Sequence, residues 1–457
     1  MIDFGSMETM NTKTKPELLI RDLGDGLILR RASVEDAESL ADINSRMHSD
    51  EGPDKPDLRI AAWVRDLVAQ PHPTLKPADF TIVEETSTGR IVSTLCSIPQ
   101  TWTFDGIEFG VGRPELVCTL PEFRRRGLVR TQMEEVHKWG DERGELVQVI
   151  TGIPNYYRQF GYDMALNIGG RRYGFEPQVP ALKNGAIEPF LIRRAEEKDI
   201  DFVLQLYTET QKRFAISCKR TPENFRYEID GQSIDNINHF ELMVIEVEEG
   251  GRVGYFLHTN MLWGGGVYAI GYELIKGVSW LDVSPSVVRY LWQKGAEYAG
   301  RDSQPRTTFG FGLGEDHPVY EALEDRLPAQ RKPYAYYVRV PDVPAFLRKV
   351  RPALEKRLAE SVVAGHTGEL KLSFYRNGVR MVFEHGKIVI IESLQVVDGV
   401  SMDAGFPDLT FLHLLFGHRS LDELRHAFTD CYWENQTGRV LLNALFPKRI
   451  SDVYPIY

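Results

Sequence analysis

The sequence has few cysteines, and their spacing does not suit a metal site or a disulfide framework. Its four cysteines, Cys96, Cys118, Cys218 and Cys431, are scattered over 457 residues, with no CxxC pair and no Cys/His cluster. This spacing argues against a zinc site and against a disulfide-stapled fold. We therefore expect no metal, and reduced thiols in a cytoplasmic protein.

The sequence also lacks a membrane-length hydrophobic run and an excess of positive charge. A membrane helix needs about 20 consecutive apolar residues, and the N-terminus has no signal-peptide hydrophobic region. The formal net charge of −11 argues against binding nucleic acid through bulk charge and mildly favours cationic partners. We expect neither a nucleic-acid nor a membrane partner.

What the sequence does contain is enough apolar material for buried cores. Hydrophobic residues make up 42% and charged residues 26% of the chain, which is typical of folded proteins. The length suggests about three domains. We treat residues 1–24 as a flexible N-terminal arm.

The most informative stretch is LVCTLPEFRRRGLVRTQMEEVHKWGDERGELVQVITGIPNYYRQFGY, from Leu116 to Tyr162. It predicts a strand, a basic turn with a glycine, a helix, a second strand, and a turn that leads to tyrosines. The first N–H groups of a helix have no intrahelical partner and suit phosphate oxygens. Arg124, Arg125 and Arg126 add charged donors, and Gly127 removes a Cβ where phosphates would approach. RRRG alone is more often a solvated turn, but its surroundings favour a ligand site.

This stretch resembles the acetyl-CoA-binding core of the GNAT N-acetyltransferase superfamily. The family signature is Gln or Arg, two residues, Gly, one residue, then Gly or Ala, which corresponds here to residues 124–129. Val129 departs from the small final residue. The family also has a tyrosine before a Phe-Gly-aromatic turn, which matches Tyr157 with residues 160–162.

The resemblance implies roles for individual residues. Backbone groups of Val117, Cys118 and Thr119 would hold the pantetheine arm of acetyl-CoA, although the Cys118 side chain suits the core. The residues that would cradle the pyrophosphate are Arg124, Arg125, Arg126, Gly127, Leu128, Val129 and Arg130. Those that would line the same crevice are Gly152, Ile153 and Asn155. Tyr157 would be the general acid, a role for which Tyr156 competes.

An internal repeat organises the chain. LILRRASVEDAESLADI begins at Leu27 and FLIRRAEEKDIDFVLQL at Phe190, an offset of 163 residues that also carries Tyr157 to Tyr320. At this offset Gly127 becomes Tyr290, with no glycine turn and no arginine cluster nearby. We therefore expect phosphate binding in the first copy only, and a packing or lining role for Tyr320.

The last part of the chain has a different character. After an amphipathic helix from Val343, alternating segments flank an Asn377-Gly378 hairpin signal, and two more helices follow. This pattern looks like a sterol-carrier-type α+β domain. His413, His418 and His426 do not form a metal-spaced set, and we interpret them as structural or surface residues.

The whole arrangement resembles the enhanced intracellular survival (Eis) family of bacterial acetyltransferases. It implies an α/β (α+β) fold with two tandem GNAT-like mixed-sheet domains, at residues 25–180 and 181–338, and a sterol-carrier-like domain at 339–457. It also implies a C-terminal carboxylate, on Tyr457, that helps to accept a proton, and symmetric hexamers.

The expected function is acetyl transfer from acetyl-CoA to a primary amine of an aminoglycoside, a polyamine or a lysine-like acceptor. Aromatic candidates for the acceptor pocket are Trp63, Phe80 and Trp102, although core packing suits each better; acidic candidates are Asp42, Asp50 and Glu51, although a solvated face suits them better. The alternative is a non-catalytic acyl-CoA or lipid-binding protein.

Overall fold

A computed structural model describes residues 18–182, 185–397 and 401–454. Its contacts divide the chain into two compact units. The first unit contains the described residues up to Ile98, together with Pro114–Trp139 and Asp235–Ile237. The second contains Pro99–Arg113, Gly140–Ile234 and the described residues from Asn238 onward. Strands β4 and β5 contribute to both.

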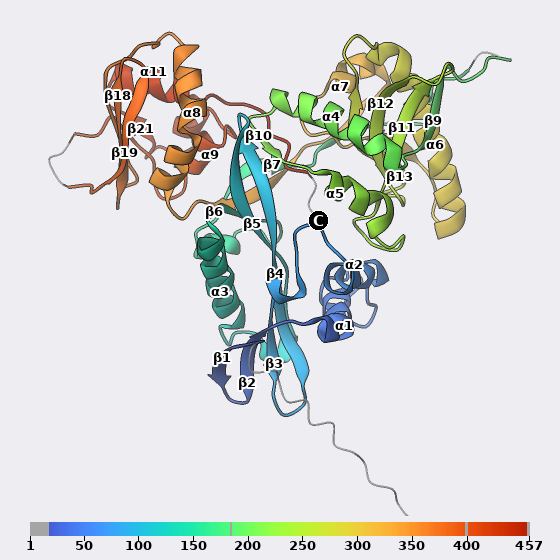
Figure 1. The fold of residues 1–457 in the computed structure, drawn as a ribbon, viewed down its shortest axis with the longest axis horizontal. Helices are drawn as coiled ribbons and strands as arrows, with labels where there is room; N and C mark the ends of the chain where they lie inside the picture. The colour runs from blue at the N-terminus through green and yellow to red at the C-terminus, as the bar shows by residue number, and fades with distance from the viewer. Residues whose placement is uncertain (1–17, 183–184, 398–400, 455–457) are drawn as a thin grey trace, which may run out of the picture. The chain divides into compact units, whose positions relative to one another are not determined.

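The first unit is an antiparallel sheet with helices (Figure 1). Its strands are β1 (Leu19–Gly24), β2 (Leu27–Arg31), β3 (Phe80–Glu85), the start of β4 (Arg90–Phe104) and the end of β5 (Ile107–Thr119). Its helices are α1 (Ala37–Met47), α2 (Leu58–Ala69) and most of α3 (Leu128–Arg143). Leu27, Leu29, Ile82 and Leu40 are buried in one apolar core. Residues 19–24, which we assigned to the N-terminal arm, form β1 instead, because they pair with β2.

The second unit contains three groups of strands. The first group consists of the start of β5, β6 (Glu145–Ile150), β16 (Tyr334–Arg339) and β7 (Asp163–Ile168), while β10 (Ile216–Cys218) pairs with the end of β4. The second is a seven-stranded sheet in the order β15 (Ala329–Arg331), β8 (Arg171–Phe175), β14 (Thr308–Phe311), β13 (Gly266–Leu274), β12 (Arg252–Thr259), β11 (Phe240–Val247) and β9 (Phe190–Arg194). The helices between these strands are α4 (Ile200–Thr210), α5 (Pro222–Arg226), α6 (Trp280–Asp302) and α7 (Pro318–Ala322).

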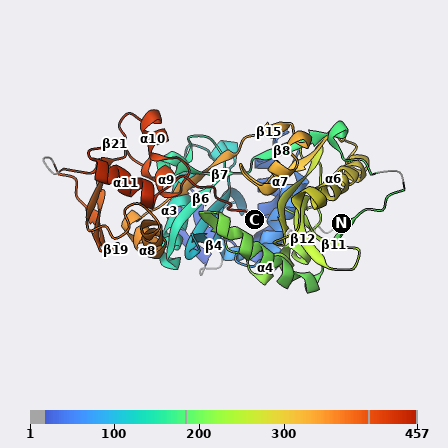
Figure 2. The ribbon, with the colours of Figure 1, turned by 90° about the horizontal axis from the view of Figure 1, so that it is seen from above.

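The third group is a five-stranded sheet near the end of the chain. Its order is β19 (Lys387–Leu394), β18 (Gly378–Glu384), β17 (Gly368–Ser373), β20 (Ala404–Gly405) and β21 (Tyr432–Trp433). Helix α8 (Val343–Ala359) packs against β19 and against α11 (Gln436–Leu445) (Figure 2). Two short helices, α9 (Phe411–Leu415) and α10 (Leu421–Ala427), lie between β20 and β21 in the sequence. The helix predicted from Val343 and the hairpin at Asn377-Gly378 are confirmed.

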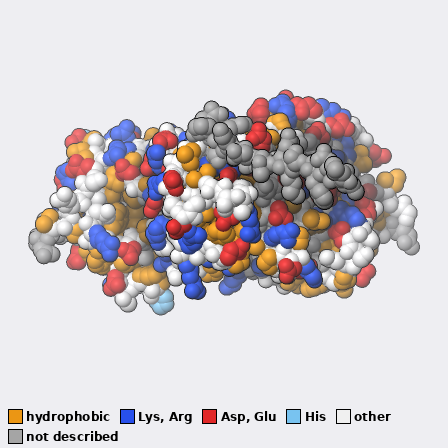
Figure 3. Space-filling model, turned by 90° about the horizontal axis from the view of Figure 1, so that it is seen from below, with side chains coloured by type: hydrophobic (Ala, Val, Ile, Leu, Met, Phe, Trp, Pro, Cys, Tyr) orange, Lys and Arg blue, Asp and Glu red, His pale blue; other side chains and the backbone are white. Residues whose placement is uncertain are grey.

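Charged side chains of both signs are interspersed with apolar ones on the face seen in Figure 3. Positive charge does not dominate the described part of this face. This view agrees with the acidic composition of the chain, which has 65 Asp and Glu residues against 54 Lys and Arg residues.

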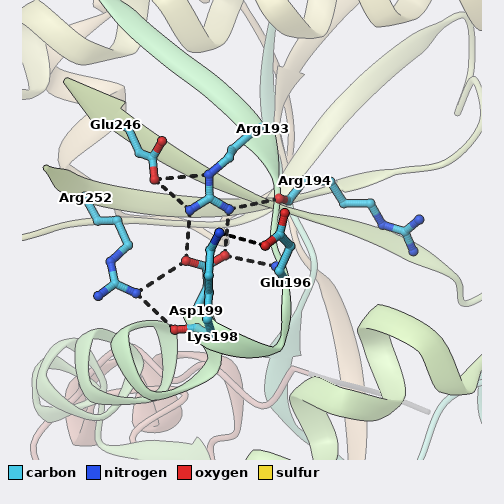
Figure 4. Close-up of polar contacts among 7 residues, drawn as sticks. All are labelled: Arg193, Arg194, Glu196, Lys198, Asp199, Glu246 and Arg252. Atoms are coloured by element: carbon cyan, nitrogen blue, oxygen red, sulfur yellow. Dashed lines mark hydrogen bonds and ion pairs between the residues drawn. The ribbon is translucent and has the colours of Figure 1, made fainter. Parts of the chain in front are cut away.

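The two copies of the repeat share an ion-pair network at the same positions. In the second copy, the Arg193 guanidinium contacts Asp199 at 2.6 Å and Glu246 at 2.6 Å (Figure 4). In the first copy, Arg30 contacts Asp36 at 2.8 Å and Glu84 at 2.6 Å. The arginines and aspartates are each separated by the predicted offset of 163 residues. The repeat inferred from the sequence is therefore present in side-chain geometry as well.

The two copies also exchange strands reciprocally within the second unit. Strand β16 lies between β6 and β7, whereas β8 lies between β14 and β15. β8 and β16 begin 163 residues apart and are equivalent elements of the two copies. Each copy thus completes its sheet with a strand of the other, which couples the two copies in one fold.

Candidate active site

The turn before α3 has an unusual backbone. Arg125 has a φ of +64° and Gly127 a φ of +78°, a left-handed region that glycine adopts without a Cβ penalty. A Cβ added at Gly127 would meet no heavy atom within 4 Å. The glycine is therefore required by its backbone conformation, and the space beside it is open to a ligand.

This turn leads directly into the N-terminus of α3. The Thr131 N–H donates to the Gly127 carbonyl at 3.1 Å, so the N–H groups of Leu128, Val129 and Arg130 precede the first turn of helical hydrogen bonds. Such groups carry partial positive charge and attract anions. The turn and the helix start together form the anion site that the sequence predicted.

The arginines of the turn differ in their partners. Arg124 donates from Nε to the Thr119 carbonyl at 3.2 Å, and Arg126 lies 3.3 Å from Asp25. Arg125 makes no hydrogen bond or ion pair with any described residue, and its side chain is exposed. Arg125 is therefore the arginine of this turn whose charge is fully available to a ligand.

The end of β5 is bent at Leu116, which has a φ of +53° and a buried side chain. After the bend, Val117 and Thr119 are half-buried, while Cys118 is buried. The Cys118 Sγ lies 3.7 Å from Asn44 Oδ1, and burial raises the pKa of this thiol. A thiol that stays protonated suits the core position expected for Cys118 and makes it a poor nucleophile.

A buried polar network holds α3 against the strands of the first unit. Gln132 accepts a hydrogen bond from Ser93 Oγ at 2.6 Å and donates to the Thr81 carbonyl at 3.1 Å. Ser93 Oγ also lies 2.9 Å from the Cys118 carbonyl and 2.8 Å from Thr119 Oγ1. The network thus fixes the start of α3 relative to the end of β5. Sequence reasoning missed these residues, because a lone Gln in an amphipathic helix carries no recognisable signal.

The predicted catalytic tyrosine lies in the second unit. Tyr157 begins a short 3₁₀ helix (Tyr157–Phe160), and its side chain is 4% exposed. Gly152 has a φ of +127°, and a Cβ placed there would lie 3.5 Å from Tyr157 Cε2. The structure therefore brings Gly152 and Tyr157 together, with a glycine where a larger residue would be strained against the ring.

Strand β16 supports this loop with two tyrosines that sequence reasoning missed. Tyr334 Oη donates to the Gly152 carbonyl at 2.8 Å, and Tyr337 Oη donates to the Ile153 carbonyl at 3.3 Å. The Tyr337 ring is 5.6 Å from that of Tyr157. These residues come from the second copy of the repeat, so no local pattern around residue 157 could reveal them.

The competing tyrosine, Tyr156, packs against its neighbours. Its ring lies 5.1 Å from that of Tyr157 and 5.9 Å from that of Phe160. Gly161 ends the short helix with a φ of +86°. Asn155, before the two tyrosines, has a φ of +63° and is exposed, as is Ile153.

The predicted site residues thus form two groups. Val117, Cys118, Thr119 and residues 124–130 lie in the first unit, and Gly152, Ile153, Asn155 and Tyr157 lie in the second. Each group is close-packed within its own unit. Tyr457 lies outside the described residues.

The second copy of the repeat differs at the equivalent positions. The Tyr320 hydroxyl accepts from the Leu313 N–H at 3.0 Å and donates to the Phe311 carbonyl at 3.0 Å, and burial raises the pKa of Tyr320 to about 12. One interpretation needs correction: a glycine turn does precede α6, at Gly277 with a φ of +92°. The fixed offset missed it because the connection before α6 is shorter and Tyr290 falls inside that helix. No arginine accompanies Gly277 in this turn.

The acceptor candidates have ordinary structural roles. Trp63, Phe80 and Trp102 are buried in apolar cores. Asp42 and Glu51 pair with residues four positions away, Arg46 and Lys55, each at 2.8 Å on the surface. These residues therefore supply no distinctive acceptor signal.

The described histidines and acidic residues do not gather as metal ligands. Within residues 18–454, gaps excepted, no group of three or more His, Cys, Asp or Glu side chains could hold a metal ion. His413 instead lies 3.1 Å from Asp163 in the second unit. No helix in the described part of the chain is long and apolar enough to cross a membrane.

Comparison with known families identifies the region that carries this site. Residues 29–165 match the family model described as an acetyltransferase (GNAT) domain. No curated protein sequence matches the chain. The matched region carries the basic turn, α3 and Tyr157. The chain is therefore an acyltransferase.

Solved structures share the fold over nearly the whole chain. A probable N-acyltransferase of Enterococcus faecalis V583 has a TM-score of 0.62 at 14% identity, and covers 93% of this chain and 97% of its own. A GCN5-related N-acetyltransferase of Kribbella flavida has a TM-score of 0.61 at 15% identity, covering 97% and 100%. Eis1 of Mycobacterium abscessus has a TM-score of 0.55 at 12% identity, covering 93% and 99%. At these identities the likeness establishes a shared mixed α/β fold.

Proposed function

We propose that this protein, which carries an acetyltransferase (GNAT) domain at residues 29–165, transfers an acetyl group from acetyl-CoA to a primary amine. The observation that carries the proposal is the turn from Arg124 to Gly127 at the start of α3. It combines an unpaired arginine, two left-handed residues and free helical N–H groups. This combination suits the pyrophosphate of a CoA thioester.

In the proposed reaction, a neutral amine attacks the carbonyl carbon of the thioester directly. A C–N bond forms, and the carbonyl oxygen becomes an oxyanion in the tetrahedral intermediate. Backbone N–H groups near Val117 and Thr119 would stabilise this charge. Collapse of the intermediate breaks the C–S bond and releases CoA.

Two proton transfers complete the reaction. Tyr157 would protonate the departing thiolate, since a phenol with a reference pKa of about 10 is protonated at neutral pH. The amine loses a proton during attack, and we propose that the terminal carboxylate of Tyr457 helps to accept it. Deletion of Tyr457, or extension of the chain beyond it, should reduce turnover while acetyl-CoA affinity is retained. An undiminished rate after extension would exclude this role.

The proposed acceptors are amines of small molecules or peptides, such as aminoglycosides, polyamines or lysine side chains. The acidic net charge of −11 favours such cations. We further propose a cytoplasmic location, a homo-oligomer, and a sterol-carrier-like domain formed by the residues from 339 onward.

A thiol-release assay with acetyl-CoA tests the function against a panel of polyamines, aminoglycosides and lysyl peptides. An acetyltransferase releases CoA in proportion to acceptor, and mass spectrometry of the acceptor shows a gain of one acetyl group. A non-catalytic binding protein would be stabilised by acyl-CoA or by fatty acids in thermal-shift measurements, but would release no thiol with any acceptor.

A further inference from the structure

The second copy of the repeat encloses a cavity of about 280 Å³ within the second unit. Strands β13 and β14 pair in parallel from Gly266 to Ala269, and β13 then continues alone. The cavity opens beside this continuation, at Ile270–Glu273. Tyr255 from β12 and the segment Ser451–Tyr454 complete its walls. At about 30 Å³ per water molecule, the space suits a ligand of roughly one ring and a short chain. Tyr157 does not line it.

The cations that line this cavity are already neutralised. Each has a carboxylate partner within ion-pair distance, and the pairs are Arg213 with Glu273, Arg220 with Glu228, Lys448 with Glu423, and Arg449 with Asp105. Asp452, which also lines the cavity, has no cationic partner among the described residues. It accepts from the Tyr454 N–H at 3.2 Å and from the side-chain amide of Gln211. The cavity therefore retains an uncompensated negative charge.

Further acceptors surround Asp452. Gln211 Oε1 and Ser451 Oγ are buried and have no hydrogen-bond partner among the described residues. Both residues line the cavity. An ammonium group has three N–H donors and no acceptor. A carboxylate, an amide oxygen and a hydroxyl beside one space match that set of donors.

The wall opposite the carboxylate is aromatic. Tyr255 is 2% exposed, lines the cavity, and its hydroxyl has no partner within the described part of the chain. Its cross-strand neighbour is Glu273, which is held by Arg213. A buried hydroxyl without a partner is costly unless a ligand or water satisfies it. Aromatic faces also attract cations.

From these observations we propose that the cavity binds an organic cation with a primary ammonium group and a small apolar body, with Asp452 as the counter-ion. An anion of the same size would face the Asp452 carboxylate while the neighbouring arginines stay committed to their partners. The site goes beyond the proposed acetyl transfer, because none of its residues belongs to the proposed acyl-CoA site.

The proposal is tested by calorimetry on the full chain at pH 7, without acetyl-CoA, using phenethylammonium as the probe. The neutral isostere 2-phenylethanol and the anion phenylacetate are the comparison ligands. We expect phenethylammonium to bind at least about tenfold more tightly than either, since a charge-assisted hydrogen bond contributes about 1.5–3 kcal/mol. Equal binding of the three ligands, or tighter binding of phenylacetate, would overturn the proposal.

Variants locate the site and separate it from the catalytic proposal. Asp452→Asn should weaken phenethylammonium binding by about tenfold or more, whereas Asp430→Asn, at an exposed carboxylate without an ion pair, should not change it. Near-ultraviolet circular dichroism confirms that each variant is folded. Tyr157→Phe should bind the probe as the unaltered chain does, whatever its acetyltransferase activity. If Asp452→Asn, folded, binds phenethylammonium with unchanged affinity, the assignment of the site is wrong.

Discussion

The side-chain oxygen of Gln132 lies 2.6 Å from Ser93 Oγ inside the first unit. Gln132 is fully buried in α3, and its amide nitrogen reaches Thr81 on β3. Because Ser93 also contacts the Cys118 carbonyl and Thr119 at the end of β5, this pair couples the strand to the helix start. The anion site is therefore held in place by a buried network rather than by its own turn alone.

Replacing Gln132 by leucine should damage both stability and acetyl-CoA binding. The change leaves Ser93 and Thr81 without a partner, and a buried polar group left unpaired costs about 1–3 kcal/mol. We expect a lower denaturation midpoint and weaker acetyl-CoA binding, measured by chemical denaturation and calorimetry. Glu134→Leu on the exposed side of the same helix is the matched control and should leave acetyl-CoA affinity unchanged. Equal effects of the two variants would argue against the network.

Acid should weaken the repeated ion-pair network in a predictable direction. Burial alone would raise the pKa values of Asp36 and Asp199, but hydrogen bonds from Arg30 and Arg193 outweigh burial and lower them. A carboxyl whose pKa is lower in the folded state stabilises the fold above its unfolded pKa of about 3.9. This stabilisation is lost as the pH falls through the lowered folded-state pKa.

The test is the unfolding free energy of Asp199→Asn against the unaltered chain over a range of pH. The loss caused by the substitution should be largest above about pH 5 and should shrink at lower pH. Asp201→Asn, at an exposed position in α4, should show little effect at any pH. A loss for Asp199→Asn that does not depend on pH would contradict the assignment.

Tyr157 should matter for turnover more than for binding. Tyr157→Phe removes the proposed proton donor and keeps the ring contacts with Tyr337 and Tyr156, so we expect kcat to fall by about 10²–10⁴-fold without unfolding. The affinity for acetyl-CoA should remain close to that of the unaltered chain. Tyr156→Phe, at the neighbouring ring, is the control. Full activity of Tyr157→Phe would remove this residue from the mechanism.

Local features of the site were predictable because local sequence determines them. The basic turn, α3 and the Tyr157 loop follow from residue types at short spacing, and the 163-residue offset located Arg193 and Asp199 in a second copy. The bend at Leu116 was not predictable, because leucine gives no sign of a left-handed conformation.

Long-range features were out of reach for a related reason. β8 and β16 are equivalent segments of the two copies, so nothing in either sequence says which sheet each strand joins. Tyr334 and Tyr337 consequently support the Gly152 loop from 182 and 184 residues away. The turn at Gly277 was missed because a fixed offset ignores a shortened connection.

Arg125 should contribute more to acetyl-CoA binding than either neighbouring arginine. Arg124 and Arg126 are engaged with Thr119 and Asp25, whereas Arg125 has no partner among the described residues. Arg125→Gln should therefore weaken acetyl-CoA binding by about tenfold, the loss expected for a charge-assisted contact to phosphate. Arg376→Gln, at an exposed arginine without an ion pair in the C-terminal region, should have no effect.

Calorimetric titration of acetyl-CoA into the unaltered chain and into Arg125→Gln tests the central claim most directly, because it asks whether the turn before α3 holds the diphosphate. Saturable binding to the unaltered chain at one site, clearly weakened in Arg125→Gln and retained in Arg376→Gln, is the result that we predict. No heat of binding with the unaltered chain, or equal affinity in all three proteins, would contradict the account.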